Sequence, residues 1–165
     1  MSDTGAPRWK PVIVAAVAAL FVALMDGLAT TLDPWYHGLK SPAWKPPDWL
    51  FGPAWTVIFA LTAIAGVLAW RATADRAQRE RIVLAFAMNA FLNVFWSLLF
   101  FRLHRPDWAL AEVVLLWLSI VWMIQVVRGP SRLAAWLLTP YLAWVSFAAA
   151  LNAAIVQLNG PFGGG

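Results

Sequence analysis

Aromatic residues and prolines gather in one stretch, residues 35–55, which holds the side chains best suited to binding another molecule. It contains four of the chain's 12 tryptophans and four of its 11 prolines. An indole offers a flat apolar face and one N–H, which suits stacking on a planar ligand or anchoring at a membrane interface. Proline restricts the backbone and removes a donor, so Ser41-Pro42 and Lys45-Pro46-Pro47 predict a stiff, extended loop. The aromatic side chains alone favour the interfacial anchor.

Polar side chains inside apolar runs form a second group. Asn89, Asn93 and Trp96 lie at i, i+4 and i+7, so they share one face of a helix. Amides at membrane depth need hydrogen-bond partners, which a neighbouring helix or a ligand can supply. For Asn93 the sequence leaves both alternatives open.

A third group lies near the C-terminus, where Trp144, Ala148 and Asn152 share a helix face just after Pro140 and Tyr141. The large side chain followed by the small one leaves room beside an aromatic wall. Either a flat ligand or a neighbouring helix can fill that room.

Asp26 and Glu112 are carboxylates well inside apolar runs. A carboxylate at bilayer depth costs on the order of 3 kcal/mol unless it is neutral, paired or near water. Glu112 lies about one turn inside its expected helix, where water and the helix dipole stabilise it, so we interpret it as structural. Asp26 could face a ligand cavity, but pairing or solvation is the favoured interpretation.

Several kinds of chemistry have no residues to support them. The chain has no cysteine, which excludes disulfides and thiol chemistry. His37 and His104 fall in separate loops without a carboxylate cluster, which argues against a metal site. No catalytic triad and no glycine-rich phosphate loop is present. The net charge of +4 comes from basic residues scattered between apolar runs, a pattern that suits lipid head groups rather than nucleic acid.

A membrane is needed to position these residues. Of 165 residues, 62% are hydrophobic and 12% charged, and the mean hydropathy is +0.69, outside the range of soluble domains. We therefore predict an all-α integral membrane protein, a single domain over residues 1–165 whose five transmembrane helices form a bundle, with the Trp/Pro-rich loop between the first two. The expected helices span about residues 11–32, 53–70, 82–101, 108–127 and 133–158.

Basic residues predict the orientation of this bundle. Eight of the 12 lie at the N-terminus and in the second and fourth loops, and four lie on the other side. The positive-inside rule then places the N-terminus in the cytoplasm and the Trp/Pro loop on the opposite face. We do not interpret the N-terminus as a signal peptide, because its apolar run exceeds ~7–15 residues and contains Asp26.

Three blocks of sequence carry a recognisable pattern. The first, within residues 35–55, reads WYHGLKSPAWKPPDWLFGPAW; the second, residues 93–101, reads NVFWSLLFF; the third, residues 140–152, reads PYLAWVSFAAALN. In this order the blocks resemble the TspO/MBR family, the translocator proteins and tryptophan-rich sensory proteins, whose members have five membrane helices. The resemblance spans about residues 12–158.

Some positions depart from the family pattern. Ser41 stands where the family has a basic residue, although Lys40 is adjacent, and Asn89 replaces the usual Gln. Arg102 follows the Phe pair where Gly is common. The sterol-recognition pattern of the animal members is missing, because no Lys or Arg follows Tyr141 in its helix, and this argues against cholesterol transport.

The resemblance implies a pocket on the loop-1 side, lined by the first, second, third and fifth helices and covered by the Trp/Pro loop. Family members bind tetrapyrroles such as protoporphyrin and heme, which need flat apolar walls and a few orienting polar groups. Trp55 and Trp144 would supply walls, and Asn93 a hydrogen bond. Lys40 or Lys45 would meet a propionate. By motif position the ligand-binding residues are Tyr36, Trp44, Pro46, Pro47, Trp55, Asn93, Trp96, Trp144 and Ala148.

The implied function is that of a membrane receptor or carrier for porphyrin-type tetrapyrroles, in tetrapyrrole handling, transport or stress-linked regulation. Porphyrin or heme is then a ligand, no cofactor is required, and no catalytic residue is expected. Some bacterial members degrade porphyrin in light, and Trp55 and Trp144 match the positions implicated there, so light-dependent breakdown is one alternative. A lipid or sterol carrier, or a structural membrane partner, is another.

The expected partners are membrane lipids and a second copy of the chain, because the family commonly forms homodimers, and not nucleic acid. Val83, Ala87 and Ala90 form a small-residue face on the third helix, away from Asn93, where a second copy, lipid or a neighbouring helix could pack. A bacterial membrane is the expected location.

Overall fold

The computed structural model describes residues 9–162, which fold into helices joined by short connections, without a strand in that range. Five of these helices are long and apolar enough to cross a membrane, which confirms the predicted all-α membrane fold. In chain order the elements are α1 (Lys10–Ala29), α2 (Pro34–Gly38), the 3-10 segment η1 (Asp48–Leu50), α3 (Phe51–Arg71), α4 (Arg76–Ser97), the π-helical segment η2 (Leu98–Arg102), α5 (Pro106–Arg128), α6 (Arg132–Leu137) and α7 (Thr139–Asn159).

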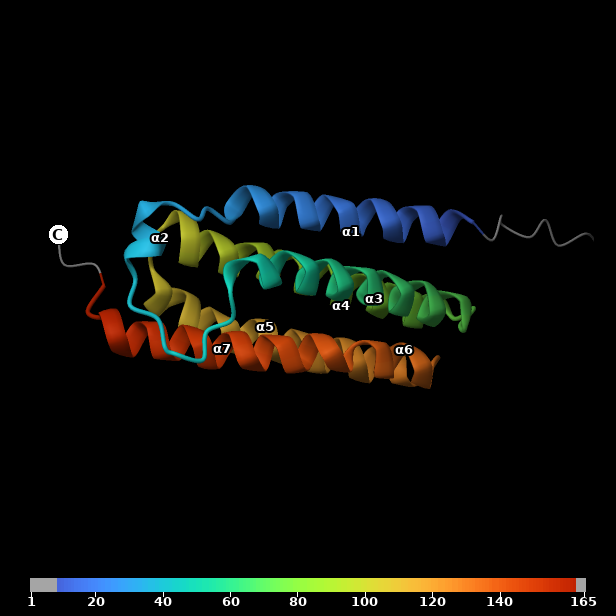
Figure 1. The fold of residues 1–165 in the computed structure, drawn as a ribbon. Helices are drawn as coiled ribbons and strands as arrows, with labels where there is room; N and C mark the ends of the chain where they lie inside the picture. The colour runs from blue at the N-terminus through green and yellow to red at the C-terminus, as the bar shows by residue number, and fades with distance from the viewer. Residues whose placement is uncertain (1–8, 163–165) are drawn as a thin grey trace, which may run out of the picture.

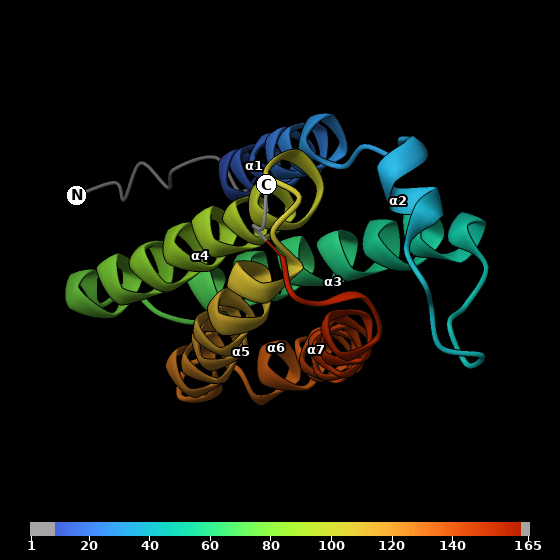
Figure 2. The same ribbon diagram turned by 90° about the vertical axis from the view of Figure 1, so that its left-hand side faces the viewer.

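The long helices lie side by side, so that α2 and the Trp/Pro loop sit at one end of the bundle with the C-terminal end of α7, and α6 sits at the other (Figure 1). We call the first of these the loop end. Viewed from the loop end, α1 lies on the opposite side of the bundle from α5 and α7 (Figure 2). Helix α5 makes its most extensive contacts with α4 and α7, whereas α1 packs on α3 and α4.

Capping side chains decide where two helices begin. Asp33 accepts a hydrogen bond from the N–H of Tyr36 at the start of α2 (2.9 Å), and Asp75 accepts one from the N–H of Gln78 at the start of α4 (2.9 Å). Each cap satisfies an N–H group that the first turn leaves unpaired. Helix α4 therefore begins at Arg76 rather than at the predicted residue 82, and the charged residues 76–81 belong to it. Helix α1 ends at Ala29 rather than 32, because Asp33 is extended and caps α2.

The last predicted helix, residues 133–158, is interrupted at Leu138. Pro140 has no N–H to bond to the carbonyl of Trp136, and the hydroxyl of Thr139 donates to that carbonyl instead (2.7 Å). The interruption separates α6 from α7, so the prediction of one continuous helix is wrong. The two helices still form one apolar span, residues 132–159.

The Trp/Pro loop is partly helical rather than wholly extended. Ser41-Pro42 and Lys45-Pro46-Pro47 lie outside the helices as predicted. Pro34, however, occupies the first position of α2, where its missing N–H costs nothing. The loop reaches the end of α7, where the side-chain amide of Asn159 accepts from the backbone N–H of Lys40 (2.7 Å) and donates to its carbonyl (2.8 Å).

The small-residue face predicted for a homodimer is left uncovered by the rest of the chain. Val83 and Ala87 are exposed on α4, and Ala90 is half-buried. Lipid or a second copy can therefore pack there, and the homodimer stays a prediction.

A chain of buried side-chain hydrogen bonds joins α4, α5 and α7. The amide Nδ2 of Asn93 donates to the hydroxyl of Tyr141 (3.1 Å), which donates to Oδ1 of Asn89 (3.1 Å). Nδ2 of Asn89 donates to the hydroxyl of Ser119 (2.9 Å), which donates to the carbonyl of Leu116 (2.7 Å). We call this series the polar chain. Neighbouring helices thus supply partners for both Asn side chains at membrane depth, except for Oδ1 of Asn93, which has none among the described residues.

Replacing Tyr141 by phenylalanine should destabilise the bundle, because both Asn side chains lose the hydroxyl between them. Buried hydrogen bonds in membrane proteins contribute about 0.6 kcal/mol on average and up to about 1.7, and an unpaired buried amide adds to the loss. We expect Tyr141→Phe to lower the free energy of unfolding by about 1–2 kcal/mol, measured by SDS titration in bicelles with circular dichroism.

The matched control is Ser146→Ala, which removes the exposed hydrogen bond from Trp117 to the same helix (2.9 Å). We expect it to cost less than about 0.5 kcal/mol. Equal losses in the two variants would contradict a special structural role for the polar chain.

Candidate functional site

A cavity of about 560 Å³ lies at the loop end of the bundle. Its volume falls within the range of about 300–1,000 Å³ that is usual for small-molecule pockets. Residues of α1, α3, α4, η2 and α7 form its walls, and residues of α2 and η1 line it from the loop side. The long helices among these are the four that the family resemblance implied.

Aromatic side chains make up much of the cavity wall. Trp55 of α3 and Trp144 of α7 meet edge to face, with ring centroids 6.4 Å apart. Trp55 also stacks on Phe59 (5.4 Å), and Trp96 of α4 stacks on Phe100 (5.3 Å). Three helices that are distant in sequence therefore present flat apolar surfaces to one cavity.

The cavity brings together five of the nine residues predicted to bind ligand. They come from α2, α3, α4 and α7, and they are Tyr36, Trp55, Trp96, Trp144 and Ala148.

The other four predicted residues lie outside the cavity lining. Trp44 is half-exposed in the loop and meets Phe147 of α7 edge to face (5.8 Å). Pro46 and Pro47 lead into η1 and shape the loop. Asn93 is buried one turn before Trp96 and belongs to the polar chain, where its Oδ1 has no hydrogen-bond partner among the described residues.

Asp48 joins two parts of the loop across the mouth of the cavity. Its Oδ1 accepts from the hydroxyl of Tyr36 (2.9 Å) and from Nζ of Lys45 (2.6 Å). Burial raises the pKa of Tyr36, so its hydroxyl stays protonated and can donate. Burial lowers the pKa of Lys45, but hydrogen bonding to Asp48 and the nearby Tyr36 raise it by more, so the ammonium group stays charged. Lys40 has an exposed side chain.

The π-helical segment η2 directs two adjacent phenylalanines into the cavity. The N–H of Leu103 donates to the carbonyl of Leu98 (2.9 Å), so this turn holds one residue more than an α-helical turn. Phe100 and Phe101 both line the cavity as a result. Both belong to the second motif block, but nothing in the hydropathy pattern signals a π-helical turn, and neither was among the predicted site residues.

Asp26 and Ser97 form a polar pair in the cavity wall. The hydroxyl of Ser97 donates to the carboxylate of Asp26, which joins α4 to α1. Asp26 is only 8% exposed, and both residues line the cavity. Asp26 is therefore paired, as the favoured interpretation had it, and it also faces the cavity.

Asn152 lines the cavity while holding α7 against α5. With its amide oriented to satisfy both groups, it donates to the carbonyl of Pro106 and accepts from the N–H of Leu110, each at 3.0 Å. The sequence left open whether a ligand or a neighbouring helix fills the space beside Trp144. The structure has both, because this face of α7 lines the cavity and also contacts α5 through Asn152.

Glu112 is more deeply buried than the sequence predicted. Because α5 begins at Pro106, Glu112 lies almost two turns inside the helix. It is 5% exposed, and neither carboxylate oxygen has a hydrogen-bond partner within residues 9–162. The prediction that water reaches this side chain is therefore wrong, because the helix starts earlier than its apolar run.

Known proteins similar to this chain include TspO proteins and translocator proteins. The TspO/MBR family model matches residues 12–158. The tryptophan-rich protein TspO of Chlorobaculum tepidum is 43% identical over 129 residues, covering 76% of this chain and 80% of that protein. The tryptophan-rich protein TspO of Archaeoglobus fulgidus is 36% identical over 153 residues, covering 89% of this chain and 98% of that protein. The translocator protein of Sus scrofa is 33% identical over 166 residues, 93% of each chain.

Replacing Asp48 by alanine should loosen the loop over the cavity, because Tyr36 and Lys45 lose their shared acceptor. We expect amide hydrogen exchange in residues 39–50 to become about tenfold faster or more, while the long helices keep their protection. Lys40→Ala is the control, since Asn159 bonds only to the backbone of that residue. Unchanged loop exchange in Asp48→Ala would show that these hydrogen bonds do not hold the loop.

Proposed function

The chain belongs to the TspO/MBR family, and we propose that it binds porphyrin-type tetrapyrroles, such as protoporphyrin or heme, in the cavity at the loop end. It is a multi-pass membrane protein. In this proposal it acts as a receptor or carrier in tetrapyrrole handling, transport or stress-linked regulation, in a bacterial membrane.

One observation carries the proposed ligand class. Trp55, Trp96 and Trp144 come from three different helices and line one cavity. Flat apolar side chains around a cavity favour a planar aromatic ligand, because they cover both its faces and its edge without leaving polar groups unpaired. The exposed loop tryptophans, Trp44 and Trp49, suit the interfacial anchor, whereas these three helix tryptophans suit the proposed ligand.

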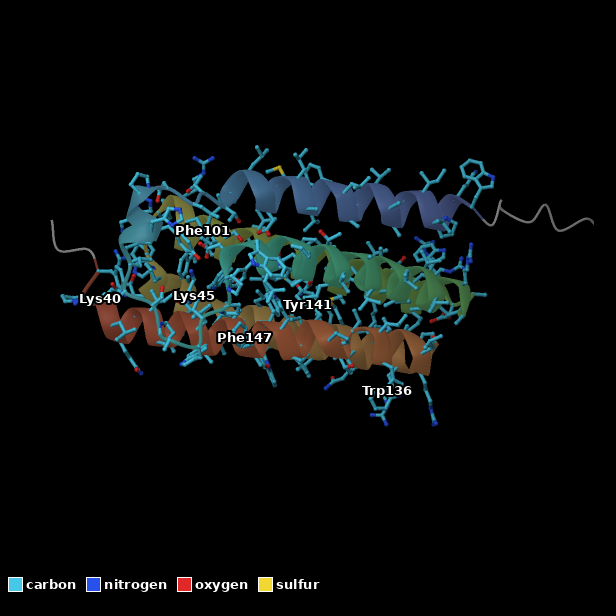
Figure 3. The ribbon with its side chains drawn as sticks, in the orientation of Figure 1. Lys40, Lys45, Phe101, Trp136, Tyr141 and Phe147 are labelled. Carbon is cyan, nitrogen blue, oxygen red and sulfur yellow. The ribbon has the colours of Figure 1, made fainter. Side chains whose placement is uncertain are left out.

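Basic side chains near the loop suit the carboxylates of such a ligand. Lys40 and Lys45 both lie at the loop end, far from Trp136 at the other end (Figure 3). Lys45 is held by Asp48 at 2.6 Å. A propionate at the mouth would replace Asp48 as the partner of this ammonium group, so binding would also release the loop contact.

A titration with protoporphyrin in the dark tests the proposal. We expect saturable binding at micromolar concentration or below, seen by tryptophan quenching and a shifted Soret band. The double variant Trp55→Phe/Trp144→Phe should bind at least about tenfold more weakly, because each loses indole contact area. Trp136→Phe, a change at a side chain that is 72% exposed, is the matched control and should bind like the wild type.

Equal affinity of the wild type and the double variant for protoporphyrin would show that Trp55 and Trp144 do not bind the tetrapyrrole. A lipid or sterol carrier, or a structural partner in the membrane, would then account better for the aromatic loop.

Light-dependent porphyrin breakdown is a second candidate, favoured by the aromatic contacts around Trp55. Its ring centroid lies 6.4 Å from that of Trp144 and 6.0 Å from that of Tyr141. The oxidisable rings of Trp55 and Trp144 line the cavity and would lie beside a photo-excited porphyrin bound there, with Tyr141 behind them.

Illumination of the porphyrin complex in air should then abolish the Soret band and yield new absorbing products, more slowly in Trp55→Phe at equal occupancy. Samples kept dark or free of oxygen are the controls. A Soret band that shifts on binding but survives illumination would show that the protein binds porphyrin without degrading it.

A further inference from the structure

The cavity at the loop end has an excess of negative charge in its wall. Asp26 and Asp48 are the carboxylates among its lining residues, and no lysine, arginine or histidine is among the described residues that line it. The lining itself therefore holds no basic side chain that could offset these two carboxylates.

Asp48 is neutralised by its neighbours in the loop. Lys45 lies 2.6 Å from its Oδ1, and the hydroxyl of Tyr36 donates to the same oxygen. Asp48 therefore already has a counter-charge and does not need a cation from the ligand.

Asp26 has no such counter-charge. In the part of the chain that the structure describes, its side-chain hydrogen-bond partner is the neutral hydroxyl of Ser97. Arg102, the basic residue that follows Ser97 in the chain, donates to the backbone carbonyl of Leu28 instead (2.7 Å). A carboxylate that is 92% buried without a cation is costly in a low-dielectric surrounding. A cation supplied by the ligand would remove that cost.

The surroundings of Asp26 suit an organic cation rather than a metal ion. No group of three or more His, Cys, Asp or Glu residues that could hold a metal occurs among the described residues. Trp55, Trp96 and Trp144 line the same cavity, and the faces of indole rings attract ammonium groups. The cavity therefore combines one buried anion with aromatic walls, which matches an aromatic molecule that carries a protonated amine.

We propose that Asp26 and Ser97 form a cation subsite in this cavity, selecting flat aromatic ligands that carry a protonated amine. The carboxylate of Asp26 accepts the N–H of the ammonium group, and Ser97 acts as a positioning residue that orients the carboxylate. The tryptophans contact the apolar body of the ligand.

This inference shares with the proposed function only its cavity, and it does not depend on porphyrin binding. A porphyrin would keep its two carboxylates away from Asp26, towards Lys45 at the mouth. The subsite thus adds a ligand class that the tetrapyrrole proposal does not require.

Two probes that differ in charge alone test the subsite. One is N,N-dimethyl-2-naphthylmethylamine, which is protonated at pH 7, and the other is 2-isobutylnaphthalene, its uncharged carbon isostere. Calorimetric titration of the full chain in nanodiscs, corrected with empty nanodiscs, should show the amine binding about tenfold more tightly or better. Asp26→Asn should abolish this preference while leaving the affinity for the isostere unchanged.

Two further variants sharpen the test. Ser97→Ala should reduce the preference severalfold, because the carboxylate loses the group that orients it. Glu80→Gln removes an exposed carboxylate outside the cavity lining, paired with Arg76 (2.8 Å), and should keep the full preference. Binding of the isostere reports a folded cavity in every variant. If Asp26→Asn does not fold, the wild-type comparison of the two probes and Ser97→Ala decide the question.

Equal affinity of the wild type for both probes, or a preference that survives Asp26→Asn, would overturn the cation subsite. Protoporphyrin titrated into the same preparations separates the two proposals. Porphyrin binding without an amine preference overturns the subsite alone, and an amine preference without porphyrin binding overturns the tetrapyrrole function alone.

Discussion

The lack of water inside a bilayer is the constraint on which most of this structure depends, because a polar group buried there is costly unless it finds a partner within the bundle. The polar chain supplies such partners at the centre, where Tyr141 bridges Asn93 and Asn89 and the series ends on α5, although Oδ1 of Asn93 has no partner among the described residues. Asn152 does the same nearer the loop end by bonding to the backbone of α5. Helices α4 and α7, which carry Trp96 and Trp144, are thereby held to a common neighbour, and the cavity lies between surfaces of defined spacing.

The contacts at the loop end differ from those inside the bundle, because they are partly exposed to water. Asp48 holds Lys45 and Tyr36 together, and Asn159 holds the backbone of Lys40. The Lys45–Asp48 ion pair is partly exposed, and such pairs contribute only modestly to stability. In the proposed function the bundle would therefore supply a constant wall, whereas the loop would release its contacts when a ligand carboxylate competes for Lys45.

In the two proposals, the aromatic walls and the buried carboxylate would contribute separately to ligand recognition. The tryptophans lie in the sequence blocks that resemble the TspO/MBR family, and they line the cavity with flat apolar area. Asp26 lies outside those blocks, and in the proposed subsite its carboxylate, paired with Ser97, would add a directional charge to the cavity.

Hydropathy alone determined that the chain spans a membrane as five helices, because a long apolar run satisfies its backbone in lipid only as a helix. The motif blocks led to five cavity residues.

Only the tertiary structure decided which faces turn inward, since a helix in lipid is apolar on both its inner and outer faces and its sequence pattern hardly distinguishes them. The burial of Glu112, the place of Asn93 in the polar chain and the pairing of Asp26 with Ser97, 71 residues away, all depended on helix packing. The helix ends and the π-helical turn likewise depended on single hydrogen bonds, which no hydropathy pattern records.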